Sequence, residues 1–373
     1  FLHAMVRDEN GKKMSKTQGN VIDPLHVVRG AKVEELGAMY QKKYPKGLPA
    51  YGADALRFTL AQLTQQGREI RLAFQRIEGN RNFANKIWNA SRFALMRMDD
   101  FHAGTTSVKD RPLSLADRWI LSRLNRTVGQ VQAALAAFQI SDAANAIYQF
   151  LWRELCDWYI ELAKGPLYGE EPVAKETTRA VLVFCLDRVY RLLHPFMPFI
   201  TEELWHKLPR TREVESISIA KYPEGDRELD DPAAEAEMKP VIEVIEGIRS
   251  IRGESNIATS VKLQAQVQSK SSDVRATLEK WRSYVMPLAG LSELRVDPPG
   301  KTPSQSAADI RAEMEVYVPL AGVVNLDAER DRLKKEIARA QGELAAVNKK
   351  LENPNFVQNA PQEVVEKDKA RVG

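Results

Sequence analysis

The sequence predicts a mainly helical fold that combines a helical bundle, a small α/β unit and a C-terminal antiparallel coiled-coil hairpin. Three observations support this prediction. Long segments between residues 76 and 208 repeat their apolar residues with the period of an α-helix. The stretch 226–324 mixes helical segments with short alternating strands, and 326–351 carries a heptad repeat.

The composition is that of a globular protein of 373 residues, with 44% hydrophobic residues. No apolar run reaches the roughly 20 residues that span a membrane. The net charge is +4, yet eight basic and two acidic residues between Arg57 and Arg97 give that window +6. Such a basic stripe favours a polyanionic partner, with a solvated helical face as the alternative. Cys156 and Cys185 lie in apolar helical runs, so we expect buried thiols in a reducing compartment and no zinc site.

The N-terminal residues 1–7, FLHAMVR, are interpreted as one strand that leads into the segment GKKMSKTQGN. Lysine is a compact charge suited to phosphate oxygens, and Lys13 and Lys16 can hold an anion from two sides. Gly11 and Gly19 give this loop freedom to move over a substrate. A basic surface turn is the alternative interpretation.

Short helices and loops are expected from 21 to 75, followed by the long helices of the bundle. The segment RNFANKIWNASRFALM is amphipathic. Its apolar face holds Phe83, Ala84, Ile87, Ala90, Ala94 and Leu95, and its polar face holds Arg81, Asn82, Asn85, Asn89 and Arg92. Three more long helices follow before residue 208. Ser141 is predicted to cap the second of these, and Pro195 and Pro198 are predicted to break the third.

The smaller mixed unit is predicted from alternating patterns. A helix is expected over 231–252, and VKLQAQVQ, LSELRVD and AEMEVYVPL read as strands around a further helical segment. The stretch PPGKTPSQS is interpreted as a loop.

The last block carries two heptad series. They consist of Leu326, Leu333, Ala340 and Val347, and of Arg330, Ile337, Leu344 and Leu351. Pro354 and Pro361 must end this helix, after which QEVVEKDKARV starts a second one. An antiparallel helical hairpin follows from this pattern, with a homodimeric coiled coil as the alternative.

Several of these segments resemble one family in the same order. KMSKTQGNVIDP resembles the KMSKS signature of class I aminoacyl-tRNA synthetases, with Thr17 in place of the final Ser. YGADALRFTLA, EGNRNFANKIWNASRF, LCDWYIELAK and LHPFMPFITEELW resemble valyl-tRNA synthetases, and LENPNFVQNAPQEVVEKDKAR resembles the coiled-coil arm of that family. The resemblance is weakest from about 225 to 320, and Asn80 stands where a Tyr is usual. Isoleucyl-tRNA synthetase is the nearest alternative, but its bacterial forms typically end in a cysteine zinc cluster.

The resemblance implies that the N-terminal strand and loop close a Rossmann-like catalytic domain whose remainder lies outside this chain. Residues 1–7 would then be an orphan strand of a missing sheet. The implied organisation is 1–20 as the end of the catalytic domain, 21–75 as a connecting stem-contact region, 76–225 as a helical anticodon-binding domain, 226–324 as a small α/β connecting domain, and 325–373 as a coiled-coil tRNA-binding arm.

The resemblance also implies a function for the whole protein, which would activate valine with ATP and Mg²⁺ and esterify it to tRNA(Val). Lys16 would contact the ATP phosphates and stabilise the transition state, and Lys13 would assist, while Met14 and Ser15 shape the loop. This chain by itself is expected to be inactive and to hold no cofactor, because valine and ATP bind through the missing catalytic domain.

The expected tRNA contacts lie on two helices. They are Arg81, Asn82, Asn85, Asn89 and Arg92 on the amphipathic helix, and Arg332, Lys335, Arg339 and Lys349 on the arm. Four aromatic residues, Trp152, Trp158, Tyr159 and Trp205, are either base-stacking groups or bundle core. We expect a cytoplasmic monomer with no metal site and no membrane partner. A stand-alone tRNA-binding module and a coiled-coil scaffold remain as alternative functions.

Overall fold

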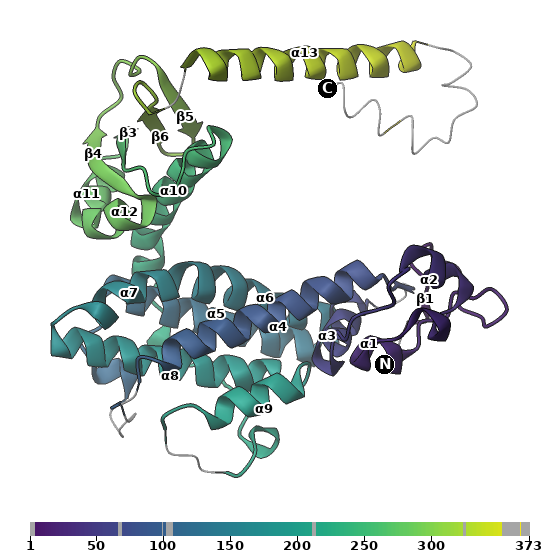
Figure 1. Ribbon diagram of the computed structural model, residues 1–373. Coiled ribbons are helices and arrows are strands. Elements are labelled where there is room, and N and C mark those ends of the chain that lie inside the picture. The colour runs from purple at the N-terminus through teal and green to yellow at the C-terminus, as the bar shows by residue number, and fades with distance from the viewer. Residues whose placement is uncertain are drawn as a thin grey trace. The chain divides into compact units, whose positions relative to one another are not determined.

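A computed structural model describes residues 4–65, 69–98, 100–101, 107–210, 214–323, 326–352 and 366. The chain divides into two compact units, Phe1–Lys239 and Pro240–Gly373 (Figure 1). Most of the described residues are helical, which confirms the prediction of a mainly helical fold. No helix in the described part of the chain is long and apolar enough to cross a membrane.

The first unit opens with short elements around a small parallel sheet. These are β1 (Val6–Arg7), α1 (Pro24–Arg29), η1 (Val33–Glu35), α2 (Ala38–Lys43), α3 (Ala53–Leu63) and β2 (Ile70–Arg71). Strand β1 pairs in parallel with β2, with Val6 opposite Ile70 and Arg7 opposite Arg71. The prediction of an orphan strand is therefore wrong for the described residues: the strand is shorter than FLHAMVR and has a partner. Sequence patterns could not show this pairing, because the two strands lie far apart in the chain.

A hydrophobic core holds these elements together. It includes Ile22, Val27, Leu36, Tyr40, Leu48, Tyr51, Ala55, Leu56, Leu72, Phe74 and Ile77, and Met14 packs against its edge. Helix α3 belongs to this core through Ala55 and Leu56. The next turn of the same helix carries Phe58, which stacks on Phe83 with ring centroids 5.2 Å apart. Helix α3 therefore joins the N-terminal core to the helices that follow.

The bundle occupies the rest of the first unit (Figure 1). Its helices are α4 (Phe74–Leu95), α5 (Leu115–Ala136), α6 (Ile140–Gln149), η3 (Phe150–Tyr159), α7 (Ile160–Tyr168), α8 (Pro172–Leu193) and α9 (Pro198–His206), with short helical turns at Val108–Asp110, Ile217–Ile219 and Arg227–Leu229. The break at Pro195 and Pro198 is confirmed, because α8 ends before the first proline and α9 begins at the second. Ser141 is not a helix cap: α6 starts at Ile140, and Ser141 is buried inside it.

Helix α6 continues through η3 into α7 without a turn, and η3 is a π-helix. The wider π-helical winding is uncommon over ten residues and shifts the side chains that follow relative to an α-helical register. The sequence pattern predicts one regular helix here, so it does not reveal this change of winding.

The second unit contains a four-stranded sheet in the order β4-β3-β6-β5. Its elements are α10 (Pro232–Glu254), which begins in the first unit, β3 (Leu263–Gln268), α11 (Ser272–Lys280), α12 (Arg282–Ala289), β4 (Leu291–Asp297), β5 (Ser306–Ile310) and β6 (Glu315–Pro319). Strands β3 and β4 are parallel, and β6 is antiparallel to both β3 and β5. The predicted strands are present, but β5 was missed because its sequence, SAADI, has low strand propensity.

Helix α13 (Leu326–Leu351) covers the whole predicted heptad segment. Ile337 is 55% exposed and Leu344 is 42% exposed, so the apolar stripe of this helix is open at these positions. The expected return helix and the turn before it lie outside the described residues, apart from Glu366, and the hairpin stays a prediction.

Candidate functional site

The signature loop, residues 10–19, rests on a buried polar pair. Asp8 and Asn20 are 1% and 2% exposed, and Asn20 Nδ2 donates a 2.8 Å hydrogen bond to Asp8 Oδ2. The same Asn20 accepts a 2.9 Å hydrogen bond from Ser15 N and donates a 3.1 Å one to the carbonyl oxygen of Lys13. The pair therefore fixes the backbone on both sides of Met14. Neither residue was singled out from the sequence, although an Asp and an Asn flanking the loop were visible there.

Asp8 stays charged in this position. Its Oδ1 accepts hydrogen bonds from the backbone N–H groups of Asn10 at 3.0 Å and of Lys12 at 2.8 Å. Burial alone would raise the pKa of Asp8, but the hydrogen bonds from Asn20, Lys12 and Asn10 outweigh it and hold the pKa below its usual value. A charged carboxylate under the loop orders its first turn.

The two candidate lysines, among the three that the loop contains, are exposed to solvent. Lys13 and Lys16 are exposed, while Met14 and Ser15 are half-buried. Neither lysine makes a side-chain hydrogen bond or ion pair with any described residue. The loop thus holds Met14 inward and leaves two uncompensated positive charges outward, which suits an anionic ligand.

The hydroxyl of Thr17 has a structural partner. Ser15 Oγ and Thr17 Oγ1 lie 3.1 Å apart, and Gln18 N donates a 3.3 Å hydrogen bond to Ser15 Oγ. The substitution of Thr for the usual Ser therefore keeps the group that makes this contact. Gly11 and Gly19 have φ angles of 78° and 61°, which glycine adopts without the penalty that other residues incur.

Helix α3 connects this region to the bundle through Asp54. Its carboxylate accepts hydrogen bonds from Phe199 N at 3.2 Å and Ile200 N at 2.7 Å, in the first turn of α9. Burial raises the pKa of Asp54, and the two backbone hydrogen bonds and Arg57 only partly offset this effect. Arg57 in turn donates to the carbonyl oxygen of Pro195 at 2.9 Å. Two segments of the family resemblance, YGADALRFTLA and LHPFMPFITEELW, therefore contact each other.

Asn80 adds a second link between α3 and α4. It is 6% exposed, and its Nδ2 donates 2.9 Å hydrogen bonds to Thr59 Oγ1 and to Gln62 Oε1. Gln62 also donates a 3.0 Å hydrogen bond to Asn145 Oδ1 on α6. The residue that departs from the family pattern thus uses its amide nitrogen to link α4 to two side chains of α3.

The predicted polar face of α4 is exposed along its whole length. This holds for all five candidate residues, Arg81, Asn82, Asn85, Asn89 and Arg92. None of their side chains makes a hydrogen bond or ion pair with the part of the chain that the structure describes. On the opposite face Phe83, Ile87 and Ala94 are buried, as the periodicity predicts.

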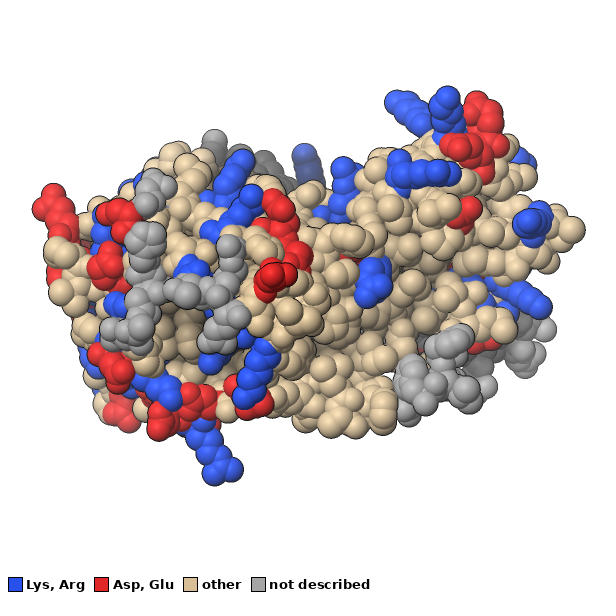
Figure 2. All heavy atoms as spheres, turned by 90° about the horizontal axis from the view of Figure 1, so that it is seen from below, with Lys and Arg blue, Asp and Glu red and all other residues tan. Residues whose placement is uncertain are grey.

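The basic stripe predicted for Arg57–Arg97 is only partly available to a ligand. Arg57 binds backbone carbonyls, Lys86 pairs with Asp157 at 2.5 Å, and Arg97 donates a 2.8 Å hydrogen bond to Tyr168 Oη. On the face of the molecule shown in Figure 2, Lys and Arg side chains are interspersed with Asp and Glu. The distribution of charged side chains therefore does not identify a single binding patch on that face.

Three of the four aromatic residues belong to the bundle core. Trp158, Tyr159 and Trp205 are 7%, 0% and 0% exposed. Tyr159 Oη donates a 2.5 Å hydrogen bond to Asp117, and Trp205 Nε1 donates a 2.7 Å one to Asp187. Base stacking by these three is therefore wrong. Trp152 is half-buried and already stacks on Tyr148 at 5.6 Å.

The candidate arm residues lie on α13. Lys335, Arg339 and Lys349 are exposed, and the side chain of Arg332 lies outside the described part. Exposed lysine and arginine side chains on a helix suit contacts with backbone phosphates.

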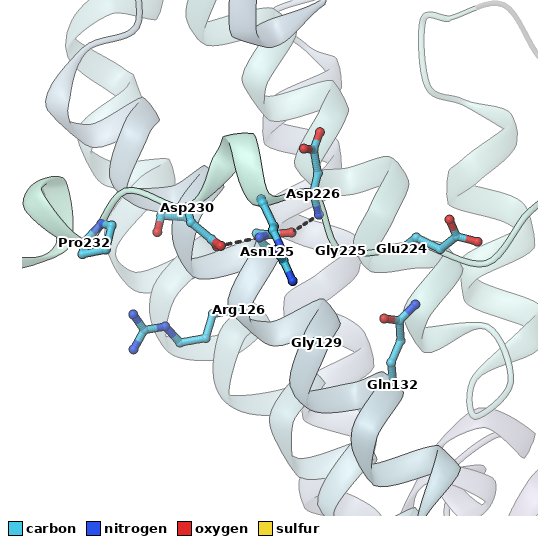
Figure 3. A pocket seen from close by; sticks show the side chains of 11 residues that line it. Asn125, Arg126, Gly129, Gln132, Glu224, Gly225, Asp226, Asp230 and Pro232 are labelled. Carbon is cyan, nitrogen blue, oxygen red and sulfur yellow. Dashed lines mark hydrogen bonds between the residues drawn. The ribbon is translucent and has the colours of Figure 1, made fainter.

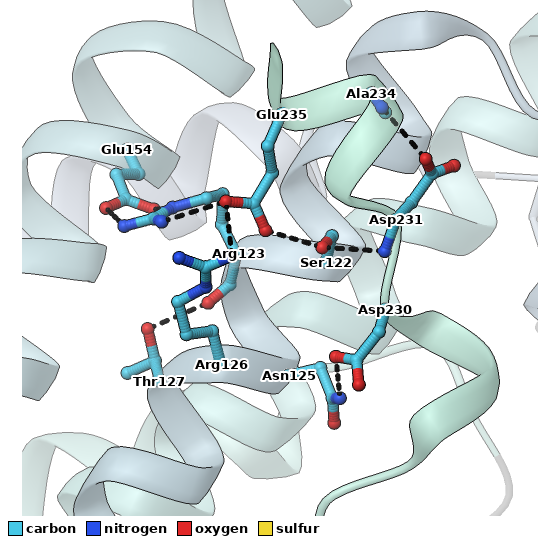
Figure 4. A network of polar contacts seen from close by, with 10 residues as sticks. All are labelled: Ser122, Arg123, Asn125, Arg126, Thr127, Glu154, Asp230, Asp231, Ala234 and Glu235. Atoms are coloured by element: carbon cyan, nitrogen blue, oxygen red, sulfur yellow. Dashed lines mark hydrogen bonds and ion pairs between the residues drawn. The ribbon is translucent and has the colours of Figure 1, made fainter.

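A network of charged residues fixes the start of α10 on α5 (Figure 4). Arg123 donates to Glu154 at 2.7 and 2.8 Å and to Glu235 at 3.2 Å, and Ser122 Oγ donates to Glu235 at 2.6 Å. Asp231 N donates a 2.9 Å hydrogen bond to Ser122 Oγ. The hydrogen bonds with Glu154 raise the pKa of Arg123 despite its burial, and Glu235 adds to this effect. The network holds the start of α10 against α5, and no sequence pattern indicated it.

A hollow of about 650 Å³ lies beside this network, between α5 and the segment 224–232 (Figure 3). Its two amide side chains are already engaged. Asn125 donates to Asp230 Oδ1 at 2.6 Å and accepts from Asp226 N at 2.7 Å, and Gln132 donates to the carbonyl oxygen of Pro223 at 2.9 Å. These hydrogen bonds hold the segment against α5.

The described residues contain no group of three or more His, Cys, Asp or Glu side chains that could hold a metal ion. Cys156 and Cys185 are buried and free, as predicted. Burial raises the pKa of the Cys156 thiol to about 12 and that of the Cys185 thiol further, so neither is a reactive thiolate.

Comparison with known families identifies three segments of the chain. Residues 1–73 match the tRNA synthetases class I (I, L, M and V), 117–267 the anticodon-binding domain of tRNA ligase, and 325–373 the valyl tRNA synthetase tRNA binding arm. The signature loop, the bundle and these matches define a class I aminoacyl-tRNA synthetase sequence.

Comparison with individual proteins narrows the class. The chain is 46% identical to the valine–tRNA ligase of Geobacter sulfurreducens, 40% to that of Syntrophotalea carbinolica and 41% to that of Bacillus cereus, in each case over 100% of its length. It covers 40%, 39% and 40% of those proteins, so it spans about 40% of the length of its curated relatives. The chain belongs to the valyl-tRNA synthetase family, which the relatives favour over the isoleucyl alternative.

A fainter structural likeness exists to a LeuRS–tRNA–LeuAMS ternary complex of Agrobacterium radiobacter K84. It has a TM-score of 0.43 and 22% identity, and it covers 61% of this chain and 24% of the other.

Proposed function

We propose that this chain forms part of a valine–tRNA ligase, in which it supplies the ATP-phosphate loop, the anticodon-binding bundle and the tRNA-binding arm. The observation that carries this proposal is the signature loop itself. Its backbone is fixed by Asp8 and Asn20, and it presents Lys13 and Lys16 to solvent without a partner among the described residues. Family membership supplies the reaction to which such a loop belongs.

In this proposal Lys16 binds the phosphate oxygens that become the leaving pyrophosphate when valine is activated. A positioned ammonium group stabilises the charge that develops on those oxygens in the transition state. Lys13 assists from the same loop. Met14 holds the loop to the N-terminal core, where it packs, and Ser15 fixes the next turn through its contacts with Asn20 and Thr17.

The residues present fit ATP phosphates better than a protein-built magnesium site. Lys13 and Lys16 are exposed cations, whereas the described residues offer no acidic cluster for a metal. Mg²⁺ would therefore be held chiefly by the phosphates of ATP, where it neutralises their charge.

The bundle and the arm are proposed to bind tRNA(Val). On α4, five exposed polar residues have no described partner, and arginine and asparagine are common phosphate and sugar donors. On the arm we propose Arg332, Lys335, Arg339 and Lys349. The proposed domain organisation keeps the boundaries 1–20, 21–75, 76–225, 226–324 and 325–373.

We also propose a cytoplasmic monomer. The two buried free cysteines support a reducing compartment. The return helix predicted after Pro354 would cover the open stripe of α13 within one chain, so that no second copy is needed.

Two measurements test the proposed function. The full-length protein should catalyse ATP–pyrophosphate exchange that depends on valine and not on isoleucine, whereas residues 1–373 alone should not. Residues 1–373 should bind tRNA(Val) transcript more tightly than the same transcript with an exchanged anticodon. Equal affinity for the two transcripts would remove the anticodon-reading role, and isoleucine-dependent exchange would move the protein to the alternative family.

A further inference from the structure

Helix α2 contacts both ends of the signature loop. Lys43 Nζ lies 2.5 Å from Glu9 Oε2 and 2.7 Å from Glu9 Oε1, just before the loop begins. At the other end, Met39 N donates a 3.3 Å hydrogen bond to the carbonyl oxygen of Gly19. The exposed lysines lie between these two fixed points, so α2 sets the position from which they act.

Gly37 and Gly19 pack against each other without room for a side chain. A Cβ placed on Gly37 would lie 2.2 Å from the carbonyl oxygen of Gly19, far inside a permitted contact. Gly37 has φ −63° and ψ 150°, an extended conformation that alanine adopts freely. Glycine at this position is therefore required by the close approach to the loop and not by the backbone angles.

The opposite side of α2 is held in the N-terminal core. Tyr40 is 2% exposed, and its ring packs edge-on against Phe74 with centroids 5.2 Å apart. Burial raises the pKa of Tyr40, and the nearby charges of Asp8 and Glu9 raise it further, so the ring stays neutral. The core thus holds α2 on one side, and α2 contacts the loop on the other. A helix held in this way fixes the position of the loop ends relative to the core.

We propose that α2 is a positioning element for the signature loop, with Gly37 and Lys43 as its positioning residues. The close contact at Gly19 and the ion pair at Glu9 hold the two ends of the loop, and only the segment around Lys13 and Lys16 is left to move. The loop then loses less conformational entropy when its lysines bind phosphate. The inference rests on the proposed function, because it assigns α2 a part in the ATP step.

The first test compares two neighbouring lysines in the full-length protein. Lys43→Gln removes the ion pair with Glu9, whereas Lys42→Gln removes an exposed charge without a partner among the described residues. The readout is the rate of tryptic cleavage after Lys13 and Lys16, measured by mass spectrometry. We expect Lys43→Gln to raise this rate about two- to fivefold, the effect of one partly exposed ion pair, and Lys42→Gln to leave it unchanged. Equal rates in the two variants overturn the proposal.

Rescue separates positioning from general damage. Lys43→Arg should keep the slow cleavage, and the exchanged pair Glu9→Lys with Lys43→Glu should restore it, because the ion pair reforms. Cleavage at the tryptic sites outside the loop that all variants share should proceed at the same rate in each of them. Faster cleavage throughout the protein would instead mean that Lys43→Gln loosens the whole fold, and the proposal would fail.

The second test uses the close contact. Gly37→Ala forces Gly19 to move, whereas Gly129→Ala on α5 meets nothing within 4 Å. Overpacking at a fixed contact should lower kcat/KM for ATP in valine-dependent exchange about tenfold or more, with the KM for valine unchanged. Gly129→Ala should behave as the wild type.

The two tests distinguish this inference from the proposed function. If the wild-type protein shows no valine-dependent exchange, the proposed function fails, while the cleavage rates still report whether α2 holds the loop. If exchange is normal and Gly37→Ala changes neither kcat/KM for ATP nor the cleavage rate, the inference fails and the proposed function stands.

Discussion

The carboxylate of Asp54 accepts a 2.7 Å hydrogen bond from the backbone N–H of Ile200, although 146 residues separate them in the chain. The first N–H groups of a helix have no hydrogen-bond acceptor within that helix, and for α9 the acceptor is a carboxylate on α3. Because α3 also belongs to the core that holds Met14, this contact lies on the path from the signature loop to the bundle.

Replacing Asp54 should destabilise the first unit. Asp54→Ala leaves the N–H groups of Phe199 and Ile200 without an acceptor, and we expect a loss of about 1–2 kcal/mol, as for other helix caps. Asp54→Asn keeps one acceptor oxygen and should lose less. Urea unfolding followed by tryptophan fluorescence measures this, since five of the six tryptophans lie in the first unit. The exposed Asp110→Ala serves as the control, and an equal loss there would contradict the capping role.

Removing the charge of Lys16 should damage the activation step itself. In the full-length protein, Lys16→Ala should lower kcat of valine-dependent ATP–pyrophosphate exchange by about 10²-fold or more, as when one preorganised donor is removed. Lys46→Ala, an exposed lysine outside the loop, should leave kcat unchanged. If Lys16→Ala raised only the KM for ATP, the lysine would bind the ground state and its proposed role would be wrong.

The buried carboxylate of Asp8 predicts a pH dependence with a definite sign. Its pKa in the folded protein lies below the ordinary value of 3.8, so its ionisation stabilises the fold above that value. This contribution is lost as the pH falls through the lowered pKa. Asp8→Asn should therefore reduce the stability of the folded protein near pH 7. It should also make stability fall less steeply as the pH is lowered toward about 3, as measured by the midpoints of urea unfolding. Asp110→Asn should leave the stability near pH 7 and its dependence on pH unchanged. If the stability of Asp8→Asn fell with pH as steeply as that of the wild type, the Asp8 carboxylate would not be the source of this pH dependence.

The polar face of α4 should contribute phosphate contacts. Arg81→Gln and Arg92→Gln should each weaken tRNA binding for cognate and non-cognate transcripts alike, and each should reduce the salt slope by about one. Arg76→Gln is the matched control, because Arg76 is exposed on the other side of the same helix. Filter binding over a range of salt concentrations gives the slopes. A loss confined to the cognate transcript would indicate base reading instead.

The arm should bind tRNA through charge and shape. Deleting the residues after 325 should weaken tRNA binding and flatten its salt dependence, because fewer counterions are released. Valine activation by the full-length protein should not change. The alternative is that the open stripe at Ile337 and Leu344 pairs with a second copy. Sedimentation separates the two, and a change from dimer to monomer with unaltered tRNA affinity would favour pairing.

Much of the fold follows from local patterns. The helical period placed Phe83 and Ile87 inside and Arg81 and Arg92 outside, and the structure agrees because burial of an apolar face decides how such a helix lies. Pro195 and Pro198 fixed the break between α8 and α9 through the missing N–H groups of proline. Patterns of this kind failed for β5, whose residues have weak strand preference and pair because β6 lies beside them.

Some residues of the candidate site could be predicted from the sequence, and others could not. The lysines were visible because a phosphate loop needs a particular residue type at a particular spacing. The role of Asp8 and Asn20 could not be predicted, because it comes from their burial against each other under the loop. No sequence pattern around Trp158 and Trp205 distinguishes a base-stacking side chain from a core side chain. Only their burial in the structure shows that they belong to the core.

The sequence by itself determined the family, the succession of helices and the identity of the loop, since these depend on residue type and spacing along the chain. The tertiary structure alone decided that β1 pairs with β2, that Asp54 caps α9, and that Gly37 packs on Gly19. Each of these contacts joins residues distant in sequence. Their energies depend on burial and exact separation, which a linear pattern does not contain.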